Sequence, residues 1–501
     1  MRLALALALL LPFRVTAQTH EHEHAHLMSV SDIGEVRFPS TCAPDAARSV
    51  EAGVTMLHSF WYDEAEKAFR HAVEQDPKCA IAYWGVAMTG YHPLWPTPVT
   101  PASLRSGSEV LATARGLTNA SARERSYVDA LSTFYDQPEG TAVHDRAVKY
   151  EAAMADVVAH YPDDDEAAIF YALSLNGAAQ LTDKTHARQK HAAEILNKQL
   201  AKHPRHPGII HYLIHSYDSP ELAPLALTAA RSYAHIAPSV PHALHMPSHI
   251  FTRLGLWDES IASNLASSKA AKEHHDPGEQ LHAMDYLEYA YLQLGRFDDA
   301  QRVIDEVRAM PQPLVETKTT YAISAIPARY ALERHDWRAA AALAPTPGVD
   351  WDKSPRTAGL TQFAIGVGAA RSGDVERAKS AEAKLTSYAD ALKTTNDAIW
   401  APQVEVQQRT VAAWRLFAEG HKDEALAAMR AAADLEDQAE KPSVTPGALL
   451  PARELLADML AEMRQPEAAL KEYKAVLAVA PNRRNATAGA AKASTSLAAV
   501  R

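Results

Sequence analysis

Histidines recur along the middle of this 501-residue chain at fixed spacings. Two histidines four residues apart are followed, further along the chain, by a second pair with the same spacing. The second pair has another histidine three residues before it. After a short insertion, three residues with the spacing of this second group follow once more. In order, the residues are His211 and His215, then His242, His245 and His249, then His282, Asp285 and Tyr289. Residues three, four or seven apart share one face of a helix. The spacing therefore predicts a cluster of imidazoles.

Imidazole is the commonest metal ligand among side chains, and a set of three or four suits zinc, copper(II), nickel or iron. We predict that the metal ligands are His211, His215, His242, His245, His249 and His282. Asp285 adds an oxygen ligand or orients a histidine from behind. The alternative is packing between helices, with the histidines hydrogen-bonded to one another or to carboxylates. The spacing alone does not decide between these two interpretations.

One residue in this pattern departs from helical geometry. Pro247 lies between His245 and His249. A proline inside a helix removes one backbone hydrogen bond and kinks the helix. We therefore expect a break there, which changes the direction in which His249 projects.

Four further residues are weaker candidates for lining the same surface. His58 and His92 are separated by the same interval as the two pairs, and both stand close to tryptophans in the sequence. Trp84 and Tyr289 are the other two. For the histidines the alternative is ordinary packing against the tryptophans, and for Trp84 it is burial in the core.

Residues 18–35 are polar and predict a disordered tail, with His20, His22, His24 and His26 at alternate positions. Cleavage before Gln18 would leave a free amine, two backbone amides and the His20 imidazole, which form a square-planar site for copper(II) or nickel(II). The alternative is a low-complexity tail with no role.

Residues 1–17 have the pattern of an export signal. Arg2 is followed by an apolar run over 3–11 and by the small-residue cleavage pattern of residues 15–17. That run is far shorter than the roughly 18 residues that span a membrane. We expect an exported protein, periplasmic or secreted, that does not span the membrane.

The two histidine pairs repeat at a period of about 34 residues, which is typical of helix-turn-helix repeats. Glu64–Phe69 followed by Asp76-Pro77 reads as a second helix and its closing turn, and Ala80–Ala87 reads as the next first helix. With the turn sequence Leu294–Ala300, these segments resemble the tetratricopeptide repeat family. The resemblance covers most of residues 42–482 and implies an all-α solenoid of paired helices. It also implies that the repeated histidine positions face the concave groove, where this family contacts its ligands.

We divide the chain accordingly into a signal peptide at 1–17, the tail at 18–35, repeat arrays at 42–343 and 356–482, and a frayed end at 483–501. The only two cysteines, Cys42 and Cys79, each precede the first helix of consecutive repeats. In an exported protein this predicts one disulfide. The alternative is two unrelated buried thiols.

The formal net charge of −11 argues against non-specific binding of nucleic acid. The sequence has no Gly-x-Ser-x-Gly, phosphate-binding glycine loop or His-Glu-x-x-His motif. We expect an exported binding scaffold whose groove holds a transition metal, a small metal-bearing ligand, a peptide or a protein. The alternatives are a histidine-ligated metalloenzyme, hydrolase or oxidoreductase, on the same scaffold, and a protein-interaction array without metal.

Overall fold

The computed structural model describes residues 32–94, 99–311, 317–395, 397–438 and 441–500, and these residues form helices and connecting turns without any strand. The N-terminal helices are α2 (Pro44–His58), α3 (Tyr62–Gln75), α4 (Ala80–Met88), α5 (Pro101–Gly116), α6 (Ala122–Tyr135), α7 (Val143–His160), α8 (Asp165–Gly177) and α9 (Ala187–Leu200). The central helices are α10 (Pro207–Ser216), η1 (Ala223–Ala226), α11 (Leu227–Ile236), α12 (Pro241–His245), α13 (Pro247–Arg253), α14 (Trp257–Glu273), α15 (Pro277–Gln293) and α16 (Phe297–Ala309). The C-terminal helices are α17 (Thr317–Glu333), α18 (Trp337–Ala341), η2 (Trp351–Lys353), α19 (Pro355–Ser372), α20 (Val375–Thr394), α21 (Trp400–Ala418), α22 (Lys422–Glu436), α23 (Ala452–Glu462), α24 (Pro466–Val479) and α25 (Arg484–Val500).

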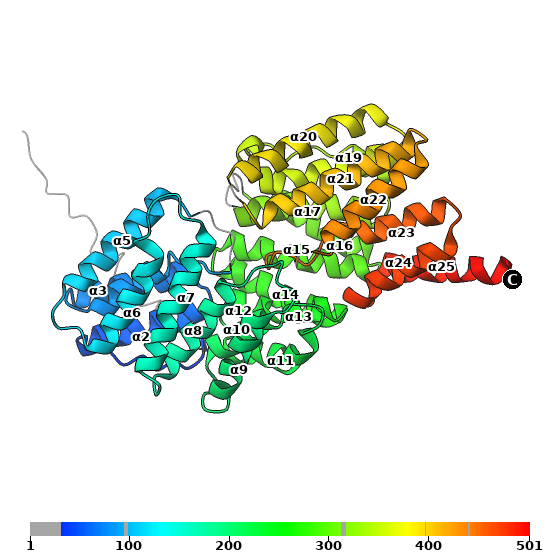
Figure 1. The fold of residues 1–501 in the computed structure, drawn as a ribbon. Helices are drawn as coiled ribbons and strands as arrows, with labels where there is room; N and C mark the ends of the chain where they lie inside the picture. Colours follow the sequence, from blue (N-terminus) through cyan, green and yellow to red (C-terminus); the bar gives the residue numbers. More distant parts are fainter. Residues whose placement is uncertain (1–31, 95–98, 312–316, 396, 439–440, 501) are drawn as a thin grey trace, which may run out of the picture.

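Consecutive helices pack side by side in chain order, so the molecule is a solenoid of helix pairs (Figure 1). The predicted all-α repeat fold is therefore confirmed. Within the described residues, no helix is both long and apolar enough to cross a membrane.

Local sequence explains where the helices begin and how the pairs interlock. Proline opens α10, α12 and α15, where its missing N–H costs no helical bond. Within a pair, small residues admit large ones: a Cβ on Gly85 of α4 would lie 2.2 Å from Cδ1 of Phe69 on α3. A glycine at φ +70°, Gly295, makes the turn between α15 and α16, where other residues would be strained.

Cys42 and Cys79 form the predicted disulfide, with Cα atoms 4.8 Å apart. Cys42 lies just before α2 and Cys79 is the N-cap of α4. The bond therefore joins the starts of the first helices of two neighbouring repeats, as the repeat register indicates.

Pro247 breaks the helix as expected, because α12 ends at His245 and α13 starts at Pro247. Met246 between them keeps right-handed helical angles, with φ −52° and ψ −36°. The two helical segments are therefore nearly continuous, and the break leaves His249 close to His245.

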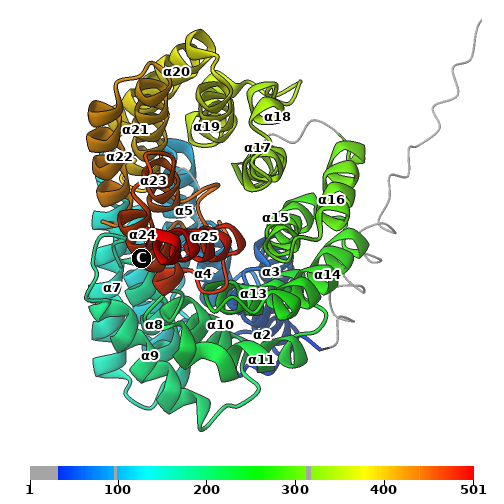
Figure 2. The same ribbon diagram turned by 90° about the vertical axis from the view of Figure 1, so that its right-hand side faces the viewer.

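The predictions for the two ends of the chain, a frayed segment at 483–501 and a disordered tail at 18–35, are wrong in part. The 483–501 end is not frayed within the described residues, because 484–500 form α25 and Arg483 is fully buried. Arg483 donates to Glu454 on α23 and to Tyr289 on α15, which brings the start of α25 next to α15, while the C-terminus itself projects outward (Figures 1 and 2). The proposed tail also ends earlier than 35, since Glu35 N donates to the Arg205 carbonyl at 3.1 Å.

Candidate metal centre

Six histidines from four helices meet inside the solenoid. They lie on α10, α12, α13 and α15 and are His211, His215, His242, His245, His249 and His282. Five of them are between 0% and 4% exposed, and His215 is half-buried. The structure brings the six predicted histidines together in two groups of three. Their side chains are buried or half-buried rather than exposed along a groove, and Ser443 and Val444 lie beside four of them.

The six rings form two groups of three ligand atoms. His211, His215 and His242 make the first triad, and His245, His249 and His282 make the second triad, with the ligand atoms of each group within 4.8 Å of one another. The triads adjoin: the ring centroids of His242 and His245 are 6.1 Å apart, and those of His215 and His249 are 5.9 Å apart. The result is one six-histidine cluster.

Four of these rings are oriented by oxygen atoms behind them. The Nδ1 atom of His211 lies 2.7 Å from the His58 carbonyl, and that of His245 lies 2.7 Å from Asn264 Oδ1. The remaining two contacts are His249 Nδ1 to Asp218 Oδ2 at 3.0 Å and His242 Nδ1 to Glu279 Oε2 at 3.2 Å. Metal-binding histidines typically donate one ring N–H to such oxygens and present the other nitrogen to the ion.

The partners of His245 and His249 settle which nitrogen of each ring carries the proton. Asn264 donates through Nδ2 to the Ser260 carbonyl at 2.7 Å, so its Oδ1 is the atom that faces His245. An oxygen acceptor requires Nδ1–H on His245, and the Asp218 carboxylate requires Nδ1–H on His249. In the neutral rings both Nε2 atoms then carry only lone pairs.

These two Nε2 atoms lie 3.0 Å apart. Two lone pairs facing each other cannot form a hydrogen bond, so with both rings neutral this contact is unfavourable, and a cation between the nitrogens would relieve it. A proton is disfavoured because burial lowers the pKa of His245 well below its ordinary value and that of His249 to about 4. For two nitrogens bound tetrahedrally at 2.0–2.1 Å to one ion, the expected separation is about 3.3 Å.

The first triad also contains a short contact between two ring nitrogens, but here the hydrogen bonds fix the tautomer of only one ring. His211 Nδ1 faces a backbone carbonyl, which only accepts, so the His211 Nε2 atom carries a lone pair. That Nε2 lies 3.1 Å from Nε2 of His215. Burial, with His215 and His242 nearby, lowers the pKa of His211 well below its ordinary value. The ring is therefore neutral, and its Nε2 lone pair can accept a hydrogen bond from His215 or bind an ion.

Asp218 links this cluster to more distant parts of the chain. Its carboxylate contacts His249, Arg253 at 2.8 Å and Lys441 at 3.2 Å. Burial alone would raise the pKa of Asp218, but Lys441 and Arg253 outweigh it and hold that pKa well below the usual range. Asp218 is therefore an ionised acceptor that fixes the His249 ring.

A segment between α22 and α23, residues 441–450, closes the cluster. Ser443 and Val444 line a small cavity together with Leu94 and four of the histidines, His215, His242, His249 and His282. The segment is fixed by two hydrogen bonds: Ser443 Oγ donates to the Leu94 carbonyl at 2.8 Å, and Tyr286 OH donates to the Thr445 carbonyl at 2.8 Å. The segment thus lies against four of the six histidines and partly covers the small space beside them.

The prediction for Asp285 is wrong. Its carboxylate pairs with Arg329 of α17, and Asp285 belongs to neither triad. The residue of α15 that joins His282 at the cluster is Tyr286, whose ring centroid lies 4.7 Å from that of His245. Neighbouring residues on a helix point about 100° apart, so Asp285 turns toward α17 when Tyr286 faces the histidines.

The weaker candidates are dispersed. Trp84 is fully buried in the core between Phe38 and Tyr127, and Tyr289 packs on Trp257 and accepts from Arg483, so neither lines the cluster. His92 stacks on Tyr62 with ring centroids 4.1 Å apart. Gln18 and His20 lie outside the described residues.

His58 belongs to a different buried group that the sequence analysis missed. It contacts Glu166 of α8, which also contacts His206, and the three form the His58–Glu166–His206 network. Glu166 and His206 both stand near the starts of the first helices of consecutive repeats, and this shared register was the available signal. Asp218, Glu279 and Asn264 were missed too, because no spacing to the histidines marks them.

Comparison with known proteins adds only the class of fold. No protein-family model matches the chain, and no curated protein matches it. Similar solved structures include the APC/C hetero-tetramer Cut9-Hcn1 (13% identity, 89% of this chain and 76% of that chain, TM-score 0.36) and the P58(IPK) TPR domain (14%, 91% and 99%, TM-score 0.22). Yeast Tom70 is another, at 13% identity, 91% and 96% coverage and a TM-score of 0.39. At these values the likeness is confined to helical-repeat architecture.

Proposed function

We propose that this chain is an exported helical-repeat scaffold that holds a buried transition-metal centre in its six-histidine cluster. The observation that carries the proposal is the contact between His245 Nε2 and His249 Nε2 at 3.0 Å, in rings whose Nδ1 atoms both face oxygen acceptors. Packing alone gives no reason for two lone pairs to meet in a dry interior. A metal ion between them removes the conflict.

The donor set narrows the choice of metal. Each triad offers three imidazole nitrogens, without sulfur, and the nearby carboxylates of Asp218 and Glu279 lie behind rings rather than among the nitrogens. Such nitrogen sets suit zinc, copper, nickel or iron, and not magnesium or calcium, which prefer oxygen. Two adjoining triads give room for two ions, one in each.

Export is part of the same proposal. The leader pattern of residues 1–17 and the Cys42–Cys79 disulfide both favour an oxidising compartment outside the cytoplasm. There a buried site would release its ion slowly, because Ser443 and Val444 lie over four of the histidines and hinder the access of chelators.

A metalloenzyme is the second candidate, favoured by the small cavity beside both triads. Three protein ligands per ion leave one coordination position, and His215, His249 and His282 line a space next to it. Catalytic metal sites keep such a position for water or dioxygen. Turnover that depends on the bound metal would distinguish this candidate from a scaffold.

The test is equilibrium metal binding by protein that lacks residues 1–31 and carries no histidine tag. The chain is stripped with a chelator, dialysed separately against zinc, copper, nickel or iron, and analysed for bound metal by mass spectrometry. We expect one to two ions per chain, held well below micromolar free metal. No retention of any of the four metals above micromolar background would overturn the proposal and leave a protein- or peptide-binding scaffold.

A further inference from the structure

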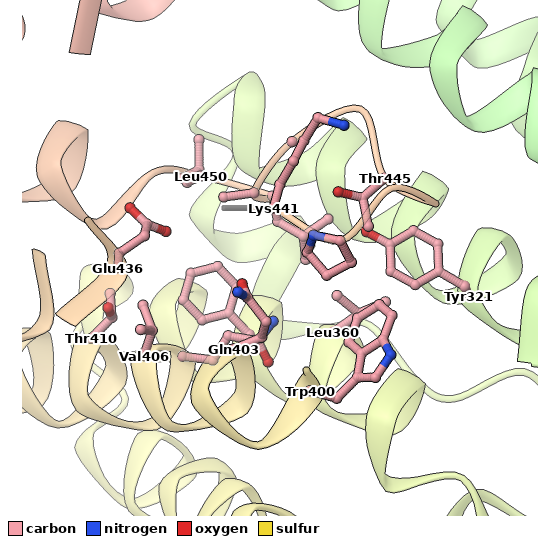
Figure 3. A pocket seen from close by; sticks show the side chains of 16 residues that line it. Tyr321, Leu360, Trp400, Gln403, Val406, Thr410, Glu436, Lys441, Thr445 and Leu450 are labelled. Atoms are coloured by element: carbon pink, nitrogen blue, oxygen red, sulfur yellow. The ribbon is translucent and has the colours of Figure 1, made fainter. Parts of the chain in front are cut away.

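Lys441 connects the 441–450 segment to the six-histidine cluster across a long distance in the chain. The segment belongs to the C-terminal half of the molecule, where its Leu449 is buried in the hydrophobic core. The Lys441 side chain extends away from Gln403 of α21 (Figure 3). Its ammonium contacts Asp218, 223 residues earlier in the sequence, with Nζ 3.2 Å from Oδ2. A C-terminal residue therefore acts on a carboxylate that orients a cluster histidine.

The oxygen that Lys441 contacts is the same oxygen that faces His249. Oδ2 of Asp218 lies 3.0 Å from His249 Nδ1, while Arg253 donates to the other oxygen, Oδ1, at 2.8 Å. A carboxylate that accepts from a metal-binding histidine raises the basicity of that ring toward the ion. Because the ammonium shares Oδ2, it draws negative charge away from His249. Lys441 therefore makes the Nε2 atom of His249 a weaker ligand.

The charged side chains beside the rings also balance one another only because Lys441 is present. Asp218 and Glu279 are negative and contact cluster rings, whereas Arg253 and Lys441 are positive and contact Asp218. Without Lys441, these groups would carry one net negative charge, which favours a cation between the rings. The Lys441 side chain is 11% exposed, so solvent and salt screen its charge poorly.

We infer that Lys441 and a metal ion in the cluster oppose each other: Lys441 lowers the affinity for the ion, and an ion bound to His249 weakens the contact between Lys441 and Asp218. The ion repels the ammonium and strengthens the hydrogen bond from His249 to Asp218, so both effects act in the same direction. Such coupling is reciprocal between the two sites. The inference rests on the proposed metal centre and describes how the C-terminal half regulates it.

A segment that only supported the cluster would behave in the opposite way. Ser443 and Val444 lie beside four of the histidines, and loss of an attachment close to them would loosen this packing. Metal affinity would then fall when Lys441 is replaced. The direction of the change in affinity therefore distinguishes electrostatic opposition from structural support.

The first experiment measures the zinc affinity of the full, tag-free chain by competition with a chromophoric chelator. Lys441→Gln removes the charge, and we expect it to bind zinc at least about fivefold tighter than the unsubstituted chain. Lys441→Arg keeps the charge and should restore the original affinity. Lys393→Gln is the control, since Lys393 forms a surface pair with Glu405 at 2.7 Å, and it should change nothing. Equal or weaker zinc binding by Lys441→Gln would overturn the inference.

The second experiment follows Lys441 on the unsubstituted chain, and it decides the matter if a variant does not fold. Acetic anhydride labels lysine amines, and mass spectrometry gives the labelling rate of each lysine with and without saturating zinc. We expect zinc to accelerate labelling of Lys441 at least about threefold and to leave Lys393 unchanged. Zinc retention with equal or slower labelling of Lys441 would overturn this inference alone. A chain that retains no zinc would overturn the metal centre as well.

Discussion

Two groups of buried histidines lie next to each other in this solenoid, and their hydrogen bonds differ. In the His58–Glu166–His206 network each ring nitrogen has a complementary partner. His58 Nδ1 contacts Tyr212 OH at 2.9 Å, and Glu166 accepts from His58 at 2.9 Å and from His206 at 2.8 Å. His206 Nδ1 accepts from Ile209 N at 3.4 Å. In the six-histidine cluster, nitrogens of the same kind face one another.

The difference shows that burial and the number of histidines do not by themselves identify a metal site. Both groups are buried and both place three ligand atoms close together. In the network, Glu166 supplies the negative charge between its two histidines, so the hydrogen bonds of these rings are satisfied by protein groups alone. In the cluster, Asp218 and Glu279 contact the Nδ1 atoms of His249 and His242, and the proposed ion would lie on the other side of these rings.

The largest expected effect is loss of metal from the cluster alone. Changing His211 and His245 together to Ala removes one nitrogen from each triad, and we expect metal affinity to fall by more than the tenfold to hundredfold typical of an outer contact. Helicity by circular dichroism should persist. Unchanged metal retention in this double variant would mean that the cluster and the network are both structural.

The pH dependence of folding should also separate the two groups. In metal-free protein the pKa of His249 is about 4 rather than 6.5, so the unfolded chain binds more protons between these values. Stability is therefore present above pH 6.5 and decreases as the pH falls toward 4, by about 3 kcal/mol for this residue alone. His211, His215 and His245, with pKa values well below the ordinary one, act in the same direction.

The measurement is urea unfolding of metal-free protein at several pH values. His249→Asn should flatten the dependence between pH 6.5 and 4, whereas His144→Asn, at a half-buried position on α7, should not. A wild-type stability that stays constant over this interval would show that the cluster is already protonated or exposed.

Breaking the network should cost stability and leave metal binding intact. Glu166→Gln leaves one of two buried histidines without its acceptor, and we expect a loss of about 3 kcal/mol in the free energy of unfolding. Glu259→Gln, in a surface pair with Arg231, should cost less than about 1 kcal/mol. If Glu166→Gln instead releases metal, the network belongs to the metal site.

A smaller effect on metal affinity is expected when the side-chain oxygen that faces His245 Nδ1 is removed. Asn264→Leu removes the acceptor that holds His245 Nδ1, so metal affinity should fall tenfold to hundredfold. Asn197→Leu is the matched control, since Asn197 also donates to a carbonyl four residues earlier but contacts no histidine of the cluster. Equal affinities for the two variants would contradict the role assigned to Asn264.

The smallest effect concerns the N-terminal histidines. Removing residues 18–31 should leave the thermal transition and the tightly bound metal nearly unchanged, because the cluster is complete without them. Removing residues 18–35 should lower the transition slightly, since Glu35 pairs with Arg205. A large loss of tight metal on the shorter deletion would move the metal site to the tail.

The convergence of the six histidines could be predicted because helical spacing and the repeat period are local properties of the sequence. Their burial could not, since it depends on residues 441–450, which come much later in the chain. Asp285 was assigned by analogy with His245, but the residue of α15 that lies beside His245 is Tyr286, and Asp285 pairs with Arg329. Asp218 and Asn264 contact the rings only through tertiary packing, so the spacing of residues in the sequence could not predict these contacts.

The most direct test of the central claim is ¹⁵N NMR of histidine-labelled, metal-free protein at pH 7, before and after addition of zinc. We predict neutral His245 and His249 with the proton on Nδ1, and zinc should shift their Nε2 signals while those of His58 and His206 stay in place. A proton on Nε2 of either ring, or an imidazolium, together with no response to zinc, would contradict the account.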